Sequence, residues 1–336
     1  MRKISIAKLC LVGIFITTIG CTKASKVSDK DIVDKEKENK FYAGAAISKV
    51  NPPLGFNIVG AFDPLPAHSI HDDLHARALV LDDGKNRIAF VVVDNLKLPR
   101  DLTDQAKRLI NAQIGLKQDN ILIAATHTHS AVSAEAGTKT QPSGYSQPFN
   151  EYGITLIEGI VKSVRDAVNN LEEAEIAWGI AKVPQHVFNR RWIMKEKVIN
   201  PFGEYDQVLM NPGINDDNKV EPAGPTDPDV SFISVRALNG KRPISLLANY
   251  ALHYIGGVPQ HEVSADYFAV FASKIKELME EENSQSVPFV GIMSNGTSGD
   301  VAGTDRSKSG PSYQPYEKMQ IVADDIAKEV YKVSQT

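Results

Sequence analysis

Apolar and polar residues alternate along most of the chain with two different periods, which predicts a mixture of strands and helices. Short apolar runs bounded by turn residues are typical of buried strands, and two such runs flank the predicted hairpin turn at residues 82–85. Longer segments with apolar residues three or four apart predict helices with one buried face. The predicted strands are 78–81, 87–93, 120–125, 174–183, 230–238, 244–252 and 288–294, and the predicted helices are 102–114, 152–171, 267–282 and 316–333.

These elements predict an α/β fold, a layered domain with a mixed β-sheet flanked by helices. Because the strands are apolar along their length, we expect both faces of the sheet to be covered. Residues 184–228 hold many of the prolines and glycines, which predicts a long loop-rich segment, and such segments are often functional. The sequence shows no internal repeat and no shift of composition, so we expect one domain at 41–336.

The first forty residues have a different character. Three basic residues precede an apolar run too short to span a bilayer, and small residues then lead to Cys21. This pattern is typical of a bacterial lipoprotein, so we predict a signal peptide at 1–20, lipidation of Cys21, and a flexible, lipid-anchored tether at 21–40. The protein is then expected in the cell envelope as an outer-membrane lipoprotein, on the periplasmic or surface face. An ordinary signal peptide with an incidental cysteine is the alternative.

Composition narrows the class of protein further. A chain of 336 residues, of which 42% are hydrophobic, can bury a full-sized core. The formal charge of −4 becomes −7 without residues 1–20, which carry three basic and no acidic residues, so nucleic acid is not an expected partner. Two cysteines cannot form a disulfide framework, and only Cys21 would remain after cleavage.

Histidines stand at the ends of two predicted strands. In Thr126-His127-Thr128-His129-Ser130 they are two residues apart, and such side chains on an extended segment point to the same side. His253 follows the strand 244–252 in a similar way. Strand ends in α/β sheets are usual ligand sites, and imidazole is a common ligand of Zn²⁺, so we predict a metal or catalytic site. The alternative is histidines that are simply hydrogen-bonded to the backbone.

Carboxylates and a polar turn occupy similar settings in the second half of the chain. Asp266 stands at a predicted helix start and Asp300 follows the strand 288–294 through the small polar run that begins at Asn295. Such a run can stabilise an anion with backbone N–H groups. We assign Asp266 and Asn295 to substrate binding and Asp300 to catalysis. A helix cap for Asp266 and an ordinary tight loop for Asp300 are the alternatives.

Two further clusters are candidates for substrate contact. His71 lies in a stretch with three histidines among eight residues, and we assign it to substrate binding. Arg190 and Arg191 stand beside Trp192, where their guanidinium groups suit a carboxylate or another polar headgroup, so we count them as catalytic. A solvated polar loop and a salt-bridged loop, respectively, are the alternatives.

Several of these segments, in this order, resemble the neutral/alkaline ceramidase family. The resemblance covers the chain from about residue 41 to its end, and its most specific part is the His-Thr-His-Ser segment. The matching segments are 44–46, 51–55, 71–78, 92–94, 125–130, 189–191, 249–253, 264–267 and 299–301.

The resemblance implies a zinc-dependent amidohydrolase that cleaves the N-acyl amide of a ceramide-like or other lipid by metal-activated water. It implies Zn²⁺ as the cofactor, His127 and His253 as zinc ligands, and His129 as a catalytic neighbour. It also suggests that Arg190 or Arg191 orients a polar group of the substrate.

The resemblance has three departures. The family's zinc site includes a glutamate and a tyrosine from a more C-terminal segment that this sequence does not reach, and Ala302 stands where members often carry a headgroup-contacting serine. Members also carry a C-terminal β-sandwich domain. Asp266, Asp300, His129 or a partner chain is therefore expected to complete the metal site. Alternatives to the enzyme are a catalytically degenerate surface lipoprotein that binds lipid or glycan, and the front part of a split or truncated gene.

Overall fold

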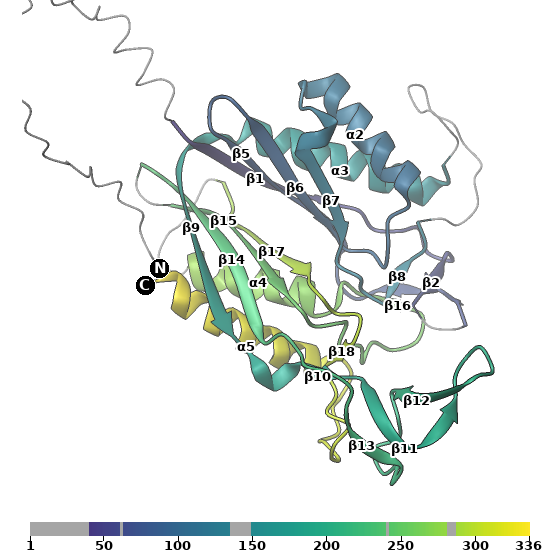
Figure 1. The fold of residues 1–336 in the computed structure, drawn as a ribbon. Helices are drawn as coiled ribbons and strands as arrows, with labels where there is room; N and C mark the ends of the chain where they lie inside the picture. Colours follow the sequence, from purple (N-terminus) through teal and green to yellow (C-terminus); the bar gives the residue numbers. More distant parts are fainter. Residues whose placement is uncertain (1–39, 61–62, 135–148, 240–241, 281–286) are drawn as a thin grey trace, which may run out of the picture.

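The computed structural model describes residues 40–60, 63–134, 149–239, 242–280 and 287–336. Its largest sheet has eight strands, with helices packed on both outer sides of them (Figure 1). The strands of this sheet are β1 (Tyr42–Lys49), β5 (His75–Asp82), β6 (Arg87–Val93), β7 (Ile121–Ala125), β9 (Glu172–Lys182), β14 (Asp229–Ala237), β15 (Pro243–Tyr250) and β17 (Val290–Asn295). The helices are α2 (Arg100–Ile114), α3 (Glu151–Asn169), α4 (Asp266–Glu280) and α5 (Glu317–Ser334).

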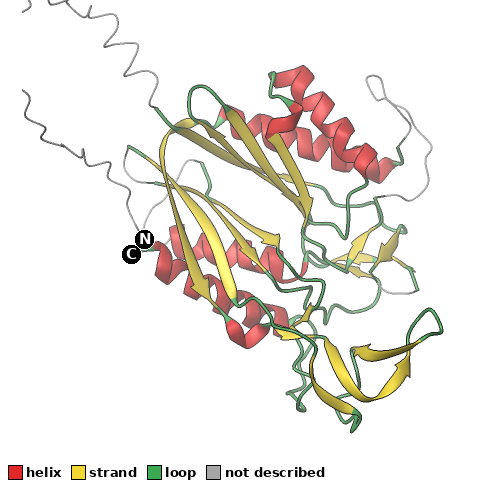
Figure 2. Cartoon of the chain, viewed as in Figure 1, coloured by secondary structure: helices red, strands yellow, loops and turns green. Residues whose placement is uncertain are grey.

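The sheet is mixed, in the order β17-β15-β14-β9-β1-β5-β6-β7. The pairs β6–β7 and β15–β17 are parallel, and the other neighbouring strands run antiparallel. Helices α2 and α3 lie on one side of the strands, and α4 and α5 lie on the other (Figure 2). The prediction of a layered α/β domain with a mixed sheet flanked by helices is therefore confirmed.

The two halves of the sheet are built by the same succession of elements. The first half consists of β1, β5, β6, α2, β7 and α3, and the second consists of β9, β14, β15, α4, β17 and α5. Within the described residues, the strands of the two halves pair with each other only where Tyr42 and Ala43 meet Glu173 and Glu172. No repeat is visible in the sequence, yet the topology repeats, because strand order depends on apolar pattern and turn position rather than on residue identity.

Three apolar cores hold these layers together. One lies between α2, α3 and the first half of the sheet, and a second lies between α4, α5 and the second half. The third contains residues of both halves, because the folded sheet packs its halves against each other. Strands such as β5 therefore serve two cores: Ala76, Ala78 and Val80 face the helices, whereas Leu79 and Leu81 face the other half.

Residues 184–228 contain a small sheet, which the prediction of a loop-rich segment did not include, although the connections between its strands are long. The strands β11 (Arg191–Ile199), β12 (Tyr205–Met210) and β13 (Lys219–Pro222) pair in the order β12-β11-β13 and project from the body (Figure 1). The prolines and glycines that suggested loops occur mostly outside or at the ends of these strands. Trp192 and Met194 are buried on one face of β11, and the charged residues that interrupt the apolar pattern lie on its exposed positions.

Short strands tie the remaining loops together at one end of the large sheet. Their pairings are β3–β2–β8, β16–β4 and β10–β18. They are β2 (Asn57–Val59), β3 (Leu65–Pro66), β4 (Ser69–Ile70), β8 (Ala131–Val132), β10 (Phe188–Asn189), β16 (Glu262–Val263) and β18 (Val301–Ala302).

The predicted signal peptide, Cys21 and the tether up to residue 39 lie outside the described residues. Within the part of the chain that the structure describes, no helix combines the length and the apolar character needed to cross a bilayer.

Candidate metal centre

Three histidines from two strand ends meet in the structure. His127 and His129 follow β7 of the first half, and His253 follows β15 of the second half. The expectation of an extended segment after β7 holds only in part, because His127 has a left-handed backbone with φ of 69°. Such a conformation is uncommon for a residue with a side chain and persists only where its surroundings enforce it. Here the N–H of His127 donates to the carbonyl of Asn95 at 2.9 Å.

Each histidine is oriented by one hydrogen bond from Nδ1 to a backbone carbonyl. His127 donates to Leu96 at 2.7 Å, His129 to Gly60 at 2.8 Å, and His253 to Ser298 at 2.9 Å. A carbonyl only accepts, so each neutral ring carries its proton on Nδ1 and presents the lone pair of Nε2. Metal-ligating imidazoles usually donate their other ring N–H to a carbonyl or carboxylate in this way, which fixes the ring orientation.

The three Nε2 atoms converge. The Nε2 of His129 lies 3.3 Å from that of His127 and 3.2 Å from that of His253. With all protons on Nδ1, these are contacts between lone pairs rather than hydrogen bonds. Tetrahedral zinc with bonds of about 2.0–2.1 Å separates its nitrogen ligands by about 3.3 Å. Both separations from His129 therefore match zinc ligands, and the ligand atoms of all three residues lie within 4.8 Å of one another, so they form a metal-capable cluster among the described residues.

Burial favours the neutral form of two of the histidines, His129 and His253. It lowers the pKa of His129 to about 4, with smaller contributions from His127, His253 and the nearby positive charge of Arg190. Burial also lowers the pKa of His253, with Arg190 and His127 contributing in the same direction. Neutral imidazole is the form that binds a metal.

The cluster rests on a support that the sequence did not reveal. A Cβ atom at Gly60 would lie 2.7 Å from Cα of His129, so only glycine allows this carbonyl to approach. The ring of Tyr254 stacks on His129 with centroids 3.8 Å apart. Neither residue belongs to a recognisable motif, so their role as supports of the cluster is visible only in the folded structure.

The segment from Ser264 to Asp266 ties the two histidine loops to each other. The carbonyl of Ser264 accepts from Oγ1 of Thr128 at 2.8 Å, and its N–H donates to the carbonyl of Ser130 at 2.9 Å. The carboxylate of Asp266 accepts from the N–H groups of Ile255 and Gly256 at 3.0 and 2.8 Å. Asp266 is fully buried, and burial raises its pKa to about 6. Its contacts are those of a residue that holds the loop after His253, not of one that faces a substrate.

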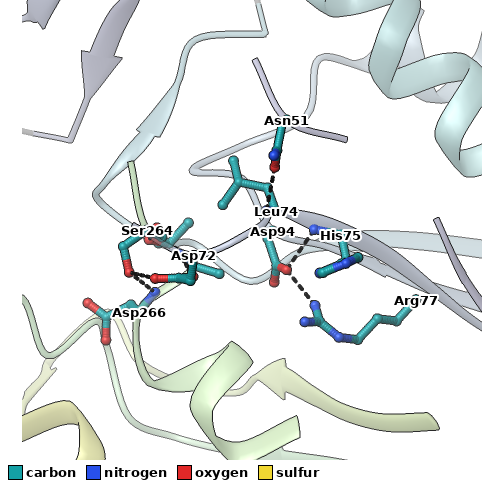
Figure 3. Close-up of polar contacts among 10 residues, drawn as sticks. Asn51, Asp72, Leu74, His75, Arg77, Asp94, Ser264 and Asp266 are labelled. Carbon is teal, nitrogen blue, oxygen red and sulfur yellow. Dashed lines mark hydrogen bonds and ion pairs between the residues drawn. The ribbon is translucent and has the colours of Figure 1, made fainter. Parts of the chain in front are cut away.

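Buried polar contacts reinforce the same end of the sheet (Figure 3). Asp72 accepts from Oγ of Ser264 and from the N–H of Ala265. Asp94, which follows β6, is fully buried and accepts from the guanidinium of Arg77 and from the N–H of His75. Asp94 directly precedes Asn95, whose carbonyl holds His127. The ion pair thus supports the loop on which His127 depends.

The other predicted site residues lie in different settings. Arg190 donates from Nε to the carbonyl of Gly299 at 2.9 Å and is near enough to the histidines to affect their pKa values. Arg191 forms an ion pair with Asp300 at 2.7 Å, and both side chains are about half exposed. Asp300 lies in the loop that contains Ser298, and Arg190 and Arg191, at the start of β11, bind to this loop, so the structure brings all three to the edge of the cluster.

Two residues predicted to contact the substrate have no described contact with the imidazole cluster. His71 is exposed and stacks on Tyr316, with ring centroids 3.6 Å apart. Asn295 ends β17, and its Oδ1 is buried and has no hydrogen-bond partner among the described residues.

The fold and the site together define an α/β layered protein with a candidate three-imidazole metal centre at its strand ends. The model of the neutral/alkaline non-lysosomal ceramidase N-terminal region matches residues 55–311, and the chain belongs to this family. The resemblance in the sequence is therefore confirmed.

Individual relatives agree with this assignment. Neutral ceramidase A of Dictyostelium discoideum is 22% identical over 318 residues, which cover 89% of this chain and 41% of that protein. The crystal structure of neutral ceramidase from Pseudomonas aeruginosa matches with a TM-score of 0.65 and 16% identity, over 89% of this chain and 45% of the other. A ceramidase complexed with C2 matches with a TM-score of 0.66 and 17% identity, over 89% and 44%. The chain thus spans less than half the length of these relatives.

Proposed function

We propose that this chain is a metal-dependent amidohydrolase that cleaves the N-acyl amide of a ceramide-like lipid. The observation that carries the proposal is the convergence of the three Nε2 atoms, each on a ring whose Nδ1 is already bound to a carbonyl. Such a pocket of lone pairs is unfavourable without a cation and suits one well.

We propose that Zn²⁺ is held by His127, His129 and His253. The sequence suggested His129 as a catalytic neighbour, but its Nε2 approaches both of the other two, which makes it a third ligand. The predicted completion of the site by His129 is thereby favoured over Asp266, whose carboxylate is occupied by backbone N–H groups. Bound zinc supplies Lewis acidity for amide hydrolysis at neutral pH.

We expect residues around the three histidines to orient the metal ligands and the substrate. The three carbonyl contacts fix the ring tautomers before any substrate arrives. Arg190 holds a positive charge at the edge of the cluster, where it attracts the amide oxygen or the carboxylate product. Asp300 is fixed by Arg191 and provides an acceptor for a hydroxyl of the substrate headgroup.

The substrate class rests on the family and on relatives whose names denote ceramidases. An N-acyl amide of a sphingoid base or a similar lipid is therefore the class to examine first.

The direct test is metal content. Purified protein is expected to hold about one zinc per chain, and His127→Ala, His129→Ala and His253→Ala should each lower zinc affinity at least about a hundredfold while the circular dichroism spectrum is kept. Arg191→Ala serves as the control, since it should leave the zinc content unchanged. A protein that folds but binds no zinc would contradict the metal-dependent hydrolase and favour the lipid- or glycan-binding module. Zinc binding without hydrolysis of any N-acyl amide would contradict the proposed reaction.

We also propose that Cys21 is lipidated and anchors the protein in the bacterial envelope. The basic and apolar leader that ends at this cysteine supports the proposal. Cys21→Ser is expected to move the protein out of the membrane fraction, and unchanged fractionation would contradict the anchor.

A further inference from the structure

The hairpin of β11 and β12 carries an exposed apolar end. Its tip is defined here as Ile199, Phe202 and Tyr205, whose exposed fractions are 63%, 89% and 73%. Ile199 and Tyr205 pair directly across the hairpin, so their side chains lie on the same face, and Phe202 stands in the turn between them. Isolated exposed apolar residues are ordinary, but three together at the end of a projecting hairpin indicate a contact surface.

We propose that this hairpin tip docks on the surface of a lipid bilayer. Aromatic side chains are favoured at the membrane interface, and apolar groups gain free energy when they leave water there. The proposal concerns docking alone and does not depend on hydrolysis.

Most polar backbone groups of the turn are hydrogen-bonded within the turn itself. The Oδ1 of Asn200 accepts from the N–H groups of Phe202 and Glu204, both at 3.0 Å, and the N–H of Gly203 donates to the carbonyl of Asn200 at 3.0 Å. Pro201 has no N–H to satisfy. An unpaired amide group is costly in an apolar medium, and these internal bonds remove most of that cost at the tip.

The distribution of charge on the hairpin agrees with a phospholipid surface. Lys197 is exposed and precedes Ile199 by two residues, in the part of β11 where the strand register is irregular. Glu204 and Asp206 flank Tyr205 and therefore alternate to the opposite face. The apolar tip thus has an exposed basic side chain nearby that can reach lipid phosphates, and Asp206, which pairs with Val198, points to the face opposite Ile199 and Tyr205.

A second copy of the chain is a less suitable occupant. Three side chains of this size offer at most about 600 Å² of surface, while a stable interface requires about 800 Å² from each partner. The nine-residue strand β11 also places the tip about 30 Å along the hairpin from Arg190. The tip therefore holds the protein at a membrane without occupying the candidate metal centre.

The test uses the full chain and phosphatidylcholine vesicles. Phe202→Trp is expected to give a blue-shifted difference emission, relative to wild type, that is quenched by brominated acyl chains. Leu122→Trp, at a half-exposed apolar position on β7, is the matched control and should show neither effect. This local readout separates the tip from any contribution of the N-terminal leader.

Loss of the tip gives the second measurement. Ile199→Ala combined with Phe202→Ala is expected to lower the vesicle partition coefficient at least about tenfold. The proposal is overturned if Phe202→Trp shows no shift while the protein is folded. It is also overturned if the shift appears with rising protein concentration in the absence of vesicles, since the tip would then contact a second copy.

Discussion

The two halves of the sheet share one topology but contribute differently to the candidate site. The first half ends its outer parallel strand, β7, with His127 and His129, whereas the second half supplies His253 from the end of the inner strand of its parallel pair, β15. In the first half the position after β6 is taken by Asp94, which is paired with Arg77. One framework thus supports ligands at one strand end and a buried ion pair at another, so topology sets where side chains meet and sequence sets what they do.

The largest effect on stability should come from the buried ion pair of Arg77 and Asp94, which is found in the first half of the sheet and sets it apart from the second half. Asp94→Ala would leave the guanidinium of Arg77 buried without a counter-charge, and we expect a loss of about 3–5 kcal/mol in the free energy of unfolding, measured with urea. Tyr250→Phe at the end of β15 is the comparison in the second half. It removes a neutral hydrogen bond to the carbonyl of Val183 and should cost about 1 kcal/mol. Equal losses would contradict the distinction between the halves.

A smaller effect should appear in the pH dependence of the metal-free protein. Burial lowers the pKa values of His129, His253 and His75 in the folded state, so the unfolded chain binds protons that the folded chain does not. The contribution of these histidines to stability is therefore complete above about pH 6.5 and falls as the pH drops toward 4. Asp266 and Asp72, whose pKa values are raised by burial, act in the opposite direction over the same range. For His129 the contribution is on the order of 1 kcal/mol once its partial exposure is allowed for.

The measurement is the urea midpoint between pH 7.5 and 4.5 in the presence of a chelator. His129→Gln should flatten this dependence, because glutamine does not titrate. A stability difference between wild type and His129→Gln that does not change as the pH falls from 7.5 to 4.5, or that changes in favour of wild type, would contradict the histidine contribution.

Much of the body could be predicted from apolar periodicity. The predicted helix 102–114 lies within α2, and the predicted helix 152–171 largely coincides with α3. The strand β1 was missed because its centre is a run of alanine and glycine and it has a single branched residue, Ile47, to signal a strand. Its Gly44 is needed for packing, since a Cβ there would lie 2.2 Å from the carbonyl oxygen of Ala167 in α3.

The residues of the site could be predicted only where their place in the sequence, at the end of a predicted strand, indicated a role. Histidines at strand ends pointed to His127, His129 and His253, and the structure brings all three together. The role of Asp266 depended on which N–H groups would lie near a buried carboxylate, and no spacing in the sequence contains that information. The repeated topology was hidden for the same reason, because equivalent positions such as Asp94 and Ala251 differ in chemistry.

The short strand pairing between the halves has a consequence for cation binding. Only two residue pairs join β1 to β9, yet the imidazole cluster draws ligands from both sides of that pairing. A cation held there would be coupled to the mutual seating of the halves, and the coupling would be reciprocal. A force or substitution that separates the halves would lower the affinity for the cation. Bound cation would in turn raise the free energy needed to separate the halves, by the same amount.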